Sequence, residues 1–365
     1  MDYISKSFYY PVTLINDAIV NCGYAREPII RKMPDGSLFC TFLTGGPTQP
    51  HNNNIVAATR SFDDGETWTD IYELFRHSAR GLWCTEIFTE GELPCMFVHT
   101  YNAESHYNEV KVFRSYTDDS GNTWSEPKSL PSGLSNVSVR QGIILSNGDW
   151  LFPVYWQVVE KGWDLYGESK GWRDREWPYN CGVLISSDKG ECFQIYGNHR
   201  VRKDIAAPTL LWENNCVEAE PGQVIMLARA SKTGYLYRSD SYDFGRTWTT
   251  MAATEIPNPD TKFSIAKIKN NIILVHNPHF STEGGHANRL GLSLWVSDDG
   301  MNTWKTKLPL IAPDIPMFYP HIFNDNENQM LYLVCENKQQ SYFMKIPYSD
   351  FLTVYDEEYN NEVWD

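Results

Sequence analysis

The stretch SFDDGETW at residues 61–68 has the composition of a tight turn between two β-strands. Asp63 can accept hydrogen bonds from the backbone N–H groups of its own turn. Gly65 supplies a backbone conformation that other residues resist, and Trp68 begins the next strand, where its ring can cover the turn. A single octapeptide of this kind predicts only a β-hairpin.

The octapeptide recurs along the chain, and we call its five copies the boxes. The four further copies lie at residues 117–124 (TDDSGNTW), 186–193 (SSDKGECF), 241–248 (SYDFGRTW) and 297–304 (SDDGMNTW). The third copy lacks the final Thr-Trp, and the last has its glycine one place early. Copies at similar intervals are the signature of a repeat architecture. Because every repeat needs its turn, whereas a catalytic residue is needed once, we expect the box aspartates to be structural and to lie away from any catalytic site. The aspartates concerned are Asp63, Asp119, Asp243 and Asp299.

Short turns between apolar runs form a second repeating feature. These six turns lie at residues 34–36, 90–92, 146–148, 221–222, 269–271 and 326–328. Their flanks alternate or run apolar, as β-strands do. Six turns with five boxes predict six four-stranded sheets, and a radial array buries the faces of such sheets against each other. The sequence therefore predicts an all-β fold, a six-bladed β-propeller with Asp-box hairpins that forms a single domain over residues 1–365. We expect a strand around residues 9–15 to complete the last blade.

One interval between a turn and its box is longer than the others. Residues 156–180 read WQVVEKGWDLYGESKGWRDREWPYN, with charges between the tryptophans. A loop of this length in a compact repeat is often functional. We predict a lid or wall over the binding site, which would bring Trp163 and Trp172 to the substrate. An interface or a plain insertion are the alternatives.

Composition limits the classes of partner. The formal net charge of −15 argues against nucleic acid and against an anionic membrane. The eight cysteines show no zinc-binding spacing, so we expect no metal and no cofactor. No signal peptide and no apolar stretch that could cross a membrane is visible, which predicts a cytoplasmic protein, or a secreted one if a signal has been trimmed.

Several polar residues fall where a propeller blade meets the mouth of the central channel. Arg26 precedes the first inner strand, and Glu213 occupies the matching place in a later blade. Arg229 ends the next strand of that blade, Arg289 precedes the third strand of another, and Tyr319 stands at the last blade. A single arginine is usually a solvated charge. Three at corresponding places predict a site for an anion, because guanidinium groups bind carboxylates through two parallel hydrogen bonds.

Over nearly its whole length the chain resembles the sialidase superfamily of Asp-box propellers. Residues 26–28 (REP) are similar to the Arg-Ile-Pro of that family, and residues 212–229 to its Glu…Arg segment. Arg289 resembles the third arginine of the family and Tyr319 its late tyrosine. The resemblance implies that the three arginines clamp a substrate carboxylate, that Tyr319 is the nucleophile and that Glu213 polarises it. We expect Tyr319 and Glu213 to form a hydrogen-bonded pair.

The sequence departs from the family where the acid/base aspartate is expected. The loop between the first inner strand and the first box reads GGPTQPHNNN at residues 45–54 and contains no Asp or Glu. Glu27 also replaces the usual apolar residue beside the first arginine. His51 is the only residue in the loop suited to acid/base chemistry near neutral pH, and we predict it in that role. An ordinary surface or turn histidine is the alternative.

Together these features predict an exo-acting glycoside hydrolase that acts on a terminal, acidic sugar different from plain sialic acid. One alternative is a polysaccharide lyase on the same propeller, with Tyr319 and His51 as acid and base in a β-elimination. Another is a carbohydrate-binding propeller without catalysis. Carbohydrate is the only partner predicted, and the oligomeric state is left open. The product separates the two enzymes, because elimination creates an unsaturated, ultraviolet-absorbing sugar.

Overall fold

The structure, a computed structural model, consists almost entirely of β-strands. It describes residues 13–14, 23–103, 110–131, 134, 137–157, 179–199 and 210–352. Two short 3-10 helices occur among these residues, η4 (His286–Asn288) and η5 (Tyr348–Asp350). No helix in the described ranges is long and apolar enough to cross a membrane.

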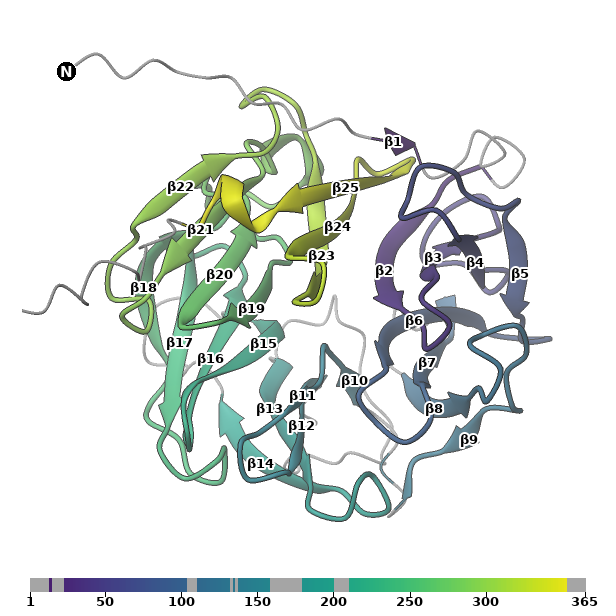
Figure 1. Ribbon diagram of the computed structural model, residues 1–365, viewed down its shortest axis with the longest axis horizontal. Helices are drawn as coiled ribbons and strands as arrows, with labels where there is room; N and C mark the ends of the chain where they lie inside the picture. Colours follow the sequence, from purple (N-terminus) through teal and green to yellow (C-terminus); the bar gives the residue numbers. More distant parts are fainter. Residues whose placement is uncertain are drawn as a thin grey trace, which may run out of the picture.

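Six antiparallel sheets are arranged around a common centre, which confirms the predicted six-bladed β-propeller (Figure 1). The first blade consists of β2 (Arg26–Lys32), β3 (Leu38–Thr44), β4 (Ile55–Ser61) and β5 (Tyr72–Phe75). The second consists of β6 (Gly81–Phe88), β7 (Cys95–Tyr101), β8 (Lys111–Tyr116) and β9 (Lys128–Ser129). The third consists of β10 (Ser138–Val139), β11 (Ile143–Ile144), β12 (Trp150–Gln157), β13 (Tyr179–Ser186) and β14 (Gln194–His199).

The second half of the ring repeats this order. The fourth blade consists of β15 (Leu211–Glu220), β16 (Gln223–Ala230), β17 (Tyr235–Ser241) and β18 (Ala252–Pro257). The fifth consists of β19 (Ser264–Ile268), β20 (Asn271–His276), β21 (Ser293–Ser297) and β22 (Thr306–Pro309). The sixth consists of β23 (Phe318–Asp325), β24 (Met330–Glu336), β25 (Ser341–Pro347) and β1 (Thr13–Leu14).

The ring is closed by a strand from the start of the chain. β1 pairs antiparallel with β25, and Thr13 lies opposite Phe343. The last blade thus obtains its outer strand from the N-terminal segment, as the missing sixth box predicted. That residues 1–365 form one domain stays a prediction.

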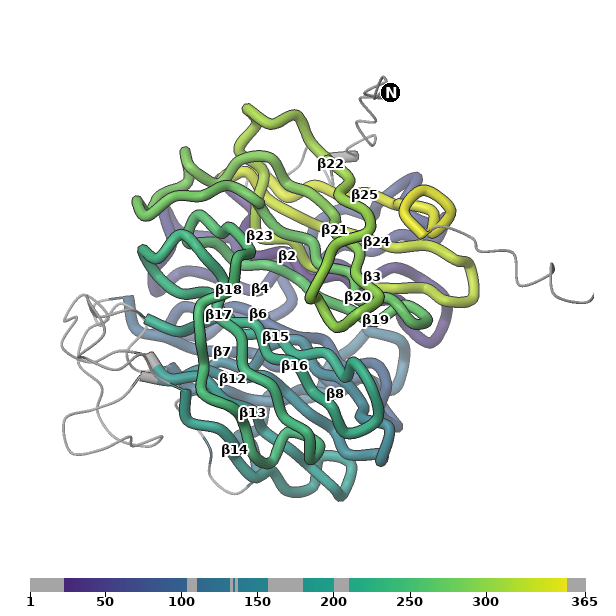
Figure 2. Tube along the Cα trace, turned by 90° about the vertical axis from the view of Figure 1, so that its left-hand side faces the viewer, coloured from purple at the N-terminus to yellow at the C-terminus, as the bar shows by residue number. Residues whose placement is uncertain are grey.

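The core of the molecule lies between the blades. Six buried apolar clusters each join two neighbouring sheets, so every junction of the ring has its own core. At the closing junction, Ile30 and Cys40 of the first blade pack with Val334 and Phe343 of the sixth. Viewed down the ring, β2, β15, β19 and β23 lie nearest the centre (Figure 1). The view from the side has β22 near one end of the molecule and β14 near the other (Figure 2). Because each sheet is covered on both faces, its strands are apolar in long runs.

The boxes close the hairpins between the third and fourth strands of their blades. In the fourth blade, the Ser241 hydroxyl donates to Asp243 Oδ1 over 2.8 Å and accepts from the Gly245 N–H over 2.8 Å. The Thr247 N–H and hydroxyl donate to the two oxygens of Asp243 over 2.7 and 2.6 Å. The Trp248 indole N–H donates to the Gly245 carbonyl over 2.7 Å. The hydroxyl, carboxylate and backbone N–H groups of this box therefore form hydrogen bonds within their own turn.

Three other boxes bind their aspartates in the same way. Hydrogen bonds from the threonine four residues later lower the pKa of each of these carboxyl groups to about 2. The three aspartates are Asp63, Asp119 and Asp299. The glycine of the first box is required sterically as well, because Gly65 has a φ of 85° and an added Cβ would lie 2.2 Å from the ring of Phe343.

The boxes lie at the opposite end of the blades from the predicted site residues. In the first blade Ser61 pairs with Leu38 and Leu38 with Lys32, at the far end of β2 from Arg26. Because the strands of a blade are antiparallel, the start of its first strand and the end of its second strand lie at one face of the ring. The box, which follows the third strand, lies at the opposite face. This confirms that the box aspartates are removed from the channel mouth.

We expect the Asp243→Ala variant to lose about 0.5–2 kcal/mol of folding free energy, as other lost caps and turn hydrogen bonds do. The folded pKa of Asp243 is lowered: burial alone would raise it, but the hydrogen bonds from Thr247 outweigh burial. The stabilisation by Asp243 is therefore fully present at pH values above the pKa of this carboxyl in the unfolded chain. It is lost as the pH falls through the lower pKa of the folded protein. Urea unfolding at pH 7 and at pH 3 measures both effects.

Asp118→Ala is the matched control, because Asp118 is an exposed aspartate beside Asp119 in the second box. Its free energy of unfolding should stay within about 0.5 kcal/mol of the parent. A D243A variant that melts like the parent but has lost its activity would contradict a structural role for the boxes.

Candidate active site

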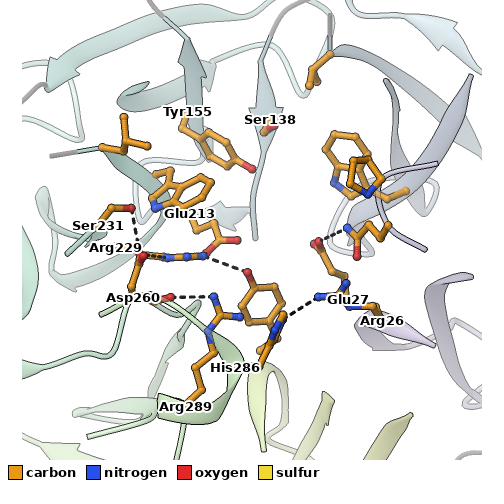
Figure 3. Close-up of a pocket in the computed structure, with 18 of the residues that line it drawn as sticks. Arg26, Glu27, Ser138, Tyr155, Glu213, Arg229, Ser231, Asp260, His286 and Arg289 are labelled. Atoms are coloured by element: carbon orange, nitrogen blue, oxygen red, sulfur yellow. Dashed lines mark hydrogen bonds and ion pairs between the residues drawn. The ribbon is translucent and has the colours of Figure 1, made fainter. Parts of the chain in front are cut away.

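A pocket of about 430 Å³ lies on the axis of the ring, at the face opposite the boxes (Figure 3). All six blades contribute to its lining, and so do the loops between them. The polar side chains lining it include Arg26, Glu27, Gln49, Ser138, Glu213, Arg229, Asp260, His286, Arg289 and Tyr319. Trp83, Val110, Tyr155, Leu210 and Trp212 form its apolar part.

A β-bulge at the pocket end of three innermost strands directs side chains into this space. Glu27 in β2, Glu213 in β15 and Tyr319 in β23 have φ values of 52°, 45° and 57°. In each strand the pairing register shifts at this residue. A left-handed residue breaks the strand alternation and turns its side chain along the channel axis. Such strain in non-glycine residues is concentrated at functional sites.

Arg229 is the centre of the polar network. Its Nη1 atom lies 2.6 Å from Glu213 Oε2 and donates to the Tyr319 hydroxyl over 3.1 Å, while its Nε donates to Asp260 Oδ1 over 2.7 Å. The guanidinium carbon lies 4.2 Å from the centre of the Trp212 ring. Arg229 is 3% exposed, so these two carboxylates neutralise a charge that is almost fully removed from water.

The pairing of Tyr319 with Glu213 differs from the sequence prediction. Among the hydrogen bonds of the described residues none joins the two side chains directly, and Arg229 Nη1 bridges them instead. Burial, followed by the negative charge of Glu213, raises the pKa of Tyr319. Burial also favours the neutral form of Glu213, but the charge of Arg229 outweighs it and lowers the pKa of that carboxyl. A neutral phenol therefore lies beside an ionised carboxylate.

Arg289 borders the same pocket from the fifth blade. Its Nη2 donates to the Asp260 carbonyl over 3.0 Å, while Nε and Nη1 have no hydrogen-bond partner among the described residues. Its guanidinium carbon lies 4.9 Å from the centre of the Tyr319 ring. A buried guanidinium with unused N–H groups retains the capacity to bind an anion.

Arg26 completes the predicted cluster from the first blade. Its Nε lies 3.4 Å from Glu336 Oε1, and its Nη2 lies 3.1 Å from His286 Nε2. Burial, with the positive charges of Arg289 and Arg26, lowers the pKa of His286 to about 3. The imidazole is therefore neutral near pH 7, and its Nε2 can accept a hydrogen bond from Arg26. The structure thus brings the three predicted arginines, Glu213 and Tyr319 to one pocket.

The prediction for His51 is wrong in its geometry. His51 is not among the residues that line the pocket, although Gln49 and Pro50 of the same loop are. Its Nδ1 accepts the Asn53 N–H over 3.0 Å, and its ring packs against Gly46. The side chain closes its own turn, which is the alternative that the sequence left open. Trp163 and Trp172, predicted to contact the substrate, lie outside the described residues.

Sequence reasoning missed several lining residues. Asp260 follows Asn-Pro in a segment that reads as an ordinary turn, and His286 lies in a glycine-rich loop, so neither carries a recognisable signal. The aromatic lining of Trp83, Tyr155 and Trp212 comes from three blades. The sequence contains 13 tryptophans, and their number alone does not show which rings meet at one pocket.

A six-bladed propeller with Asp-box hairpins and an axial pocket lined by three arginines and a tyrosine has the architecture of the sialidase superfamily. In agreement with it, residues 79–333 match the model of the BNR repeat-like domain. Because this match covers more than half of the sequence, the chain belongs to that family.

Similar proteins and solved structures agree with this family. The chain is similar to a sialidase of Paraclostridium sordellii, with 23% identity over 260 residues that cover 64% of this chain and 59% of the relative. It is also similar to a sialidase of Clostridium perfringens, with 24% identity over 267 residues, or 65% and 64% of the two chains. The chain thus spans about three-fifths of the length of these relatives. A Hadza microbial sialidase shares the fold with a TM-score of 0.73 at 16% identity, over 93% of this chain and 69% of that one.

Proposed function

We propose that the chain is an exo-acting glycoside hydrolase and that its substrate is a terminal sugar carrying a carboxylate. The contact that carries the proposal is that of Arg229 Nη1 with both the Tyr319 hydroxyl and Glu213. It joins a phenol, a base and a cation at the pocket lined by Arg26 and Arg289. The relatives named as sialidases support the same reaction class.

Each group has a role that its chemistry suits. A neutral phenol at Tyr319 can approach an anomeric carbon that bears a carboxylate without charge repulsion. The ionised Glu213 can take the phenolic proton during attack, since a phenol is a weak nucleophile until a base removes its proton. Arg229 then stabilises the developing phenolate, while Arg289 and Arg26 hold the carboxylate of the sugar. Sialidases with a tyrosine nucleophile are an exception to the two-carboxylate rule of glycosidases.

The position of His51 bears on both alternatives. A lyase with Tyr319 and His51 as acid and base is not supported, because His51 does not line the pocket. A propeller that binds sugars without cleaving them requires only the arginines, and a His51 that does not line the pocket agrees with it. What favours turnover over binding alone is the buried network around Tyr319, which a binding site does not need.

The test is an activity screen of the intact protein against aryl glycosides of neutral and acidic sugars and against acidic oligosaccharides. New reducing ends without ultraviolet absorbance of an unsaturated sugar are the expected result, restricted to acidic substrates. Products that absorb would instead establish a lyase. Binding of acidic sugars by calorimetry, with no product from any of them, would establish a carbohydrate-binding propeller and overturn the proposal.

A further inference from the structure

The loop at residues 45–54 brings no carboxylate to the pocket, yet three carboxylates from other segments line it. These are Glu27, Glu213 and Asp260. Glu213 and Asp260 are both bound to Arg229, at 2.6 and 2.7 Å. Within the described part of the chain, Glu27 alone of the three forms no ion pair with an arginine or lysine. Of the three lining carboxylates it is therefore the one that no buried salt bridge holds.

The backbone holds Glu27 towards the pocket. Its φ of 52° belongs to the bulge that starts β2, and its N–H donates to the buried carboxylate of Glu336. The amide of Gln49 donates to Glu27 Oε1 over 2.9 Å. Gln49 belongs to the loop at residues 45–54, which contains no acidic residue. The carboxyl group of Glu27, on β2, thus lies at the edge of the pocket that this loop forms.

Glu27 and Glu213 approach the pocket from opposite sides. Figure 3 shows the carboxylate of Glu27 on one wall, and those of Glu213 and Asp260 with Arg229 on the other. Arg229 Nη1 connects the second wall to the Tyr319 hydroxyl. A sugar bound between the walls would therefore have the nucleophile on one side and the Glu27 carboxyl on the other. Acid and nucleophile on opposite sides of the scissile bond are the arrangement that displacement at an anomeric carbon requires.

We propose that Glu27 is the general acid and base of the reaction. This assignment rests on the proposed function and deepens it. In the first step the Tyr319 oxygen bonds to the anomeric carbon as its proton passes to Glu213. The bond from that carbon to the leaving oxygen breaks with its electron pair, and the oxygen takes the proton of the Glu27 carboxylic acid. The products are a sugar joined to Tyr319, a free alcohol and an ionised Glu27.

The second step restores every group. Water attacks the anomeric carbon and gives one proton to the Glu27 carboxylate. The bond between that carbon and the Tyr319 oxygen breaks, the electron pair returns to the oxygen, and Glu213 gives back its proton. The sum is one glycoside and one water converted into one sugar and one alcohol. Glu27 begins and ends as a carboxylic acid, and the tyrosine as a phenol.

The isosteric variant Glu27→Gln tests the assignment, because it keeps the shape and removes the proton. For substrates with poor alcohol leaving groups, kcat/KM should fall by about 10²–10⁴-fold. For aryl glycosides whose leaving group needs no proton, release of the phenol should fall much less. Turnover of these substrates should increase with added azide, which attacks the sugar on Tyr319 without a base and yields a glycosyl azide. The limb of the pH profile that reports the acid should disappear.

The controls separate catalysis from folding. Glu92→Gln removes an exposed carboxylate far from the pocket, and His51→Ala removes the residue that closes its own turn. Both should keep the leaving-group dependence and the pH profile of the parent. Glu27→Asp should recover part of the activity on poor leaving groups, because it restores an acid on a shorter arm.

Each other outcome overturns the assignment. An E27Q variant whose activity on poor leaving groups and whose pH profile match the parent shows that another group is the acid. Equal loss on all substrates without azide rescue shows that Glu27 only binds or supports the site. If the parent protein cleaves no glycoside, the proposed function fails together with this assignment. If the parent protein is active and the E27Q variant is equally active, the assignment of Glu27 is wrong while the proposed function stands.

Discussion

The Tyr319→Phe variant should lose turnover by at least about 10³-fold while it retains its affinity for acidic sugars. Only the hydroxyl is removed, and with it the atom that attacks. Arg26 and Arg289, which would hold the carboxylate of the sugar, remain. The ring stays between Phe318 and the Arg289 guanidinium, so the walls of the pocket keep their shape. Steady-state kinetics measures the loss of turnover, and calorimetry with an acidic sugar measures the affinity.

Tyr348→Phe is the matched control for this variant. The Tyr348 hydroxyl donates to Asn326 Oδ1 over 3.0 Å, away from the pocket. Its removal costs about 1 kcal/mol of stability, as the loss of one hydrogen bond does, and leaves turnover unchanged. If Y319F keeps more than a tenth of the activity, Tyr319 is not the nucleophile.

The Arg229→Met variant should lower the free energy of unfolding by about 3–5 kcal/mol, because it leaves two buried carboxylates without their partner. Both Nε and Nη1 of Arg229 are used, on Asp260 and on Glu213. Burial opposes the charge on Arg229, but those two carboxylates hold its pKa well above the ordinary value. Activity should disappear as well, and urea unfolding followed by tryptophan fluorescence measures the change in stability.

Arg289→Met is the contrasting variant in the same pocket. Arg289 donates only to a backbone carbonyl, and two of its nitrogens have no partner among the described residues. Its replacement should weaken the binding of acidic sugars, while the free energy of unfolding falls by less than in R229M. Equal stability losses in the two variants would contradict the view that Arg229 supports the fold and Arg289 serves the ligand.

The fold could be predicted because its determinants are local and repeated. Each box closes its turn with a hydroxyl, a carboxylate, a glycine and a backbone N–H from eight consecutive residues. A single copy is ambiguous, but five boxes at similar intervals together with six short turns define the number of blades. The closing strand was predictable by the same argument, since a sheet without a box lacks one strand and the N-terminal segment supplies it.

The site was predictable only in part. The arginines, Glu213 and Tyr319 were found because they recur where strands meet the channel. The bulges that direct Glu27, Glu213 and Tyr319 were not, because glutamate and tyrosine do not favour left-handed backbone. His51 was predicted wrongly, since the sequence gives the loop on which a side chain lies but not the direction in which it points. The cytoplasmic location stays a prediction.

The left-handed bulge at the start of the inner strands has a consequence for how such a protein changes during evolution. A non-glycine residue in a left-handed position bears a backbone cost of order 1–3 kcal/mol. An exchange of Glu27, which forms no ion pair among the described residues, breaks no buried salt bridge. What changes is the chemical group delivered to the axis, while the cores between the blades are untouched. Glu27 occupies such a position beside Arg26, which lines the same pocket. A different chemical group can therefore be delivered to the axis by a substitution at position 27, without a new loop and without refolding of a blade.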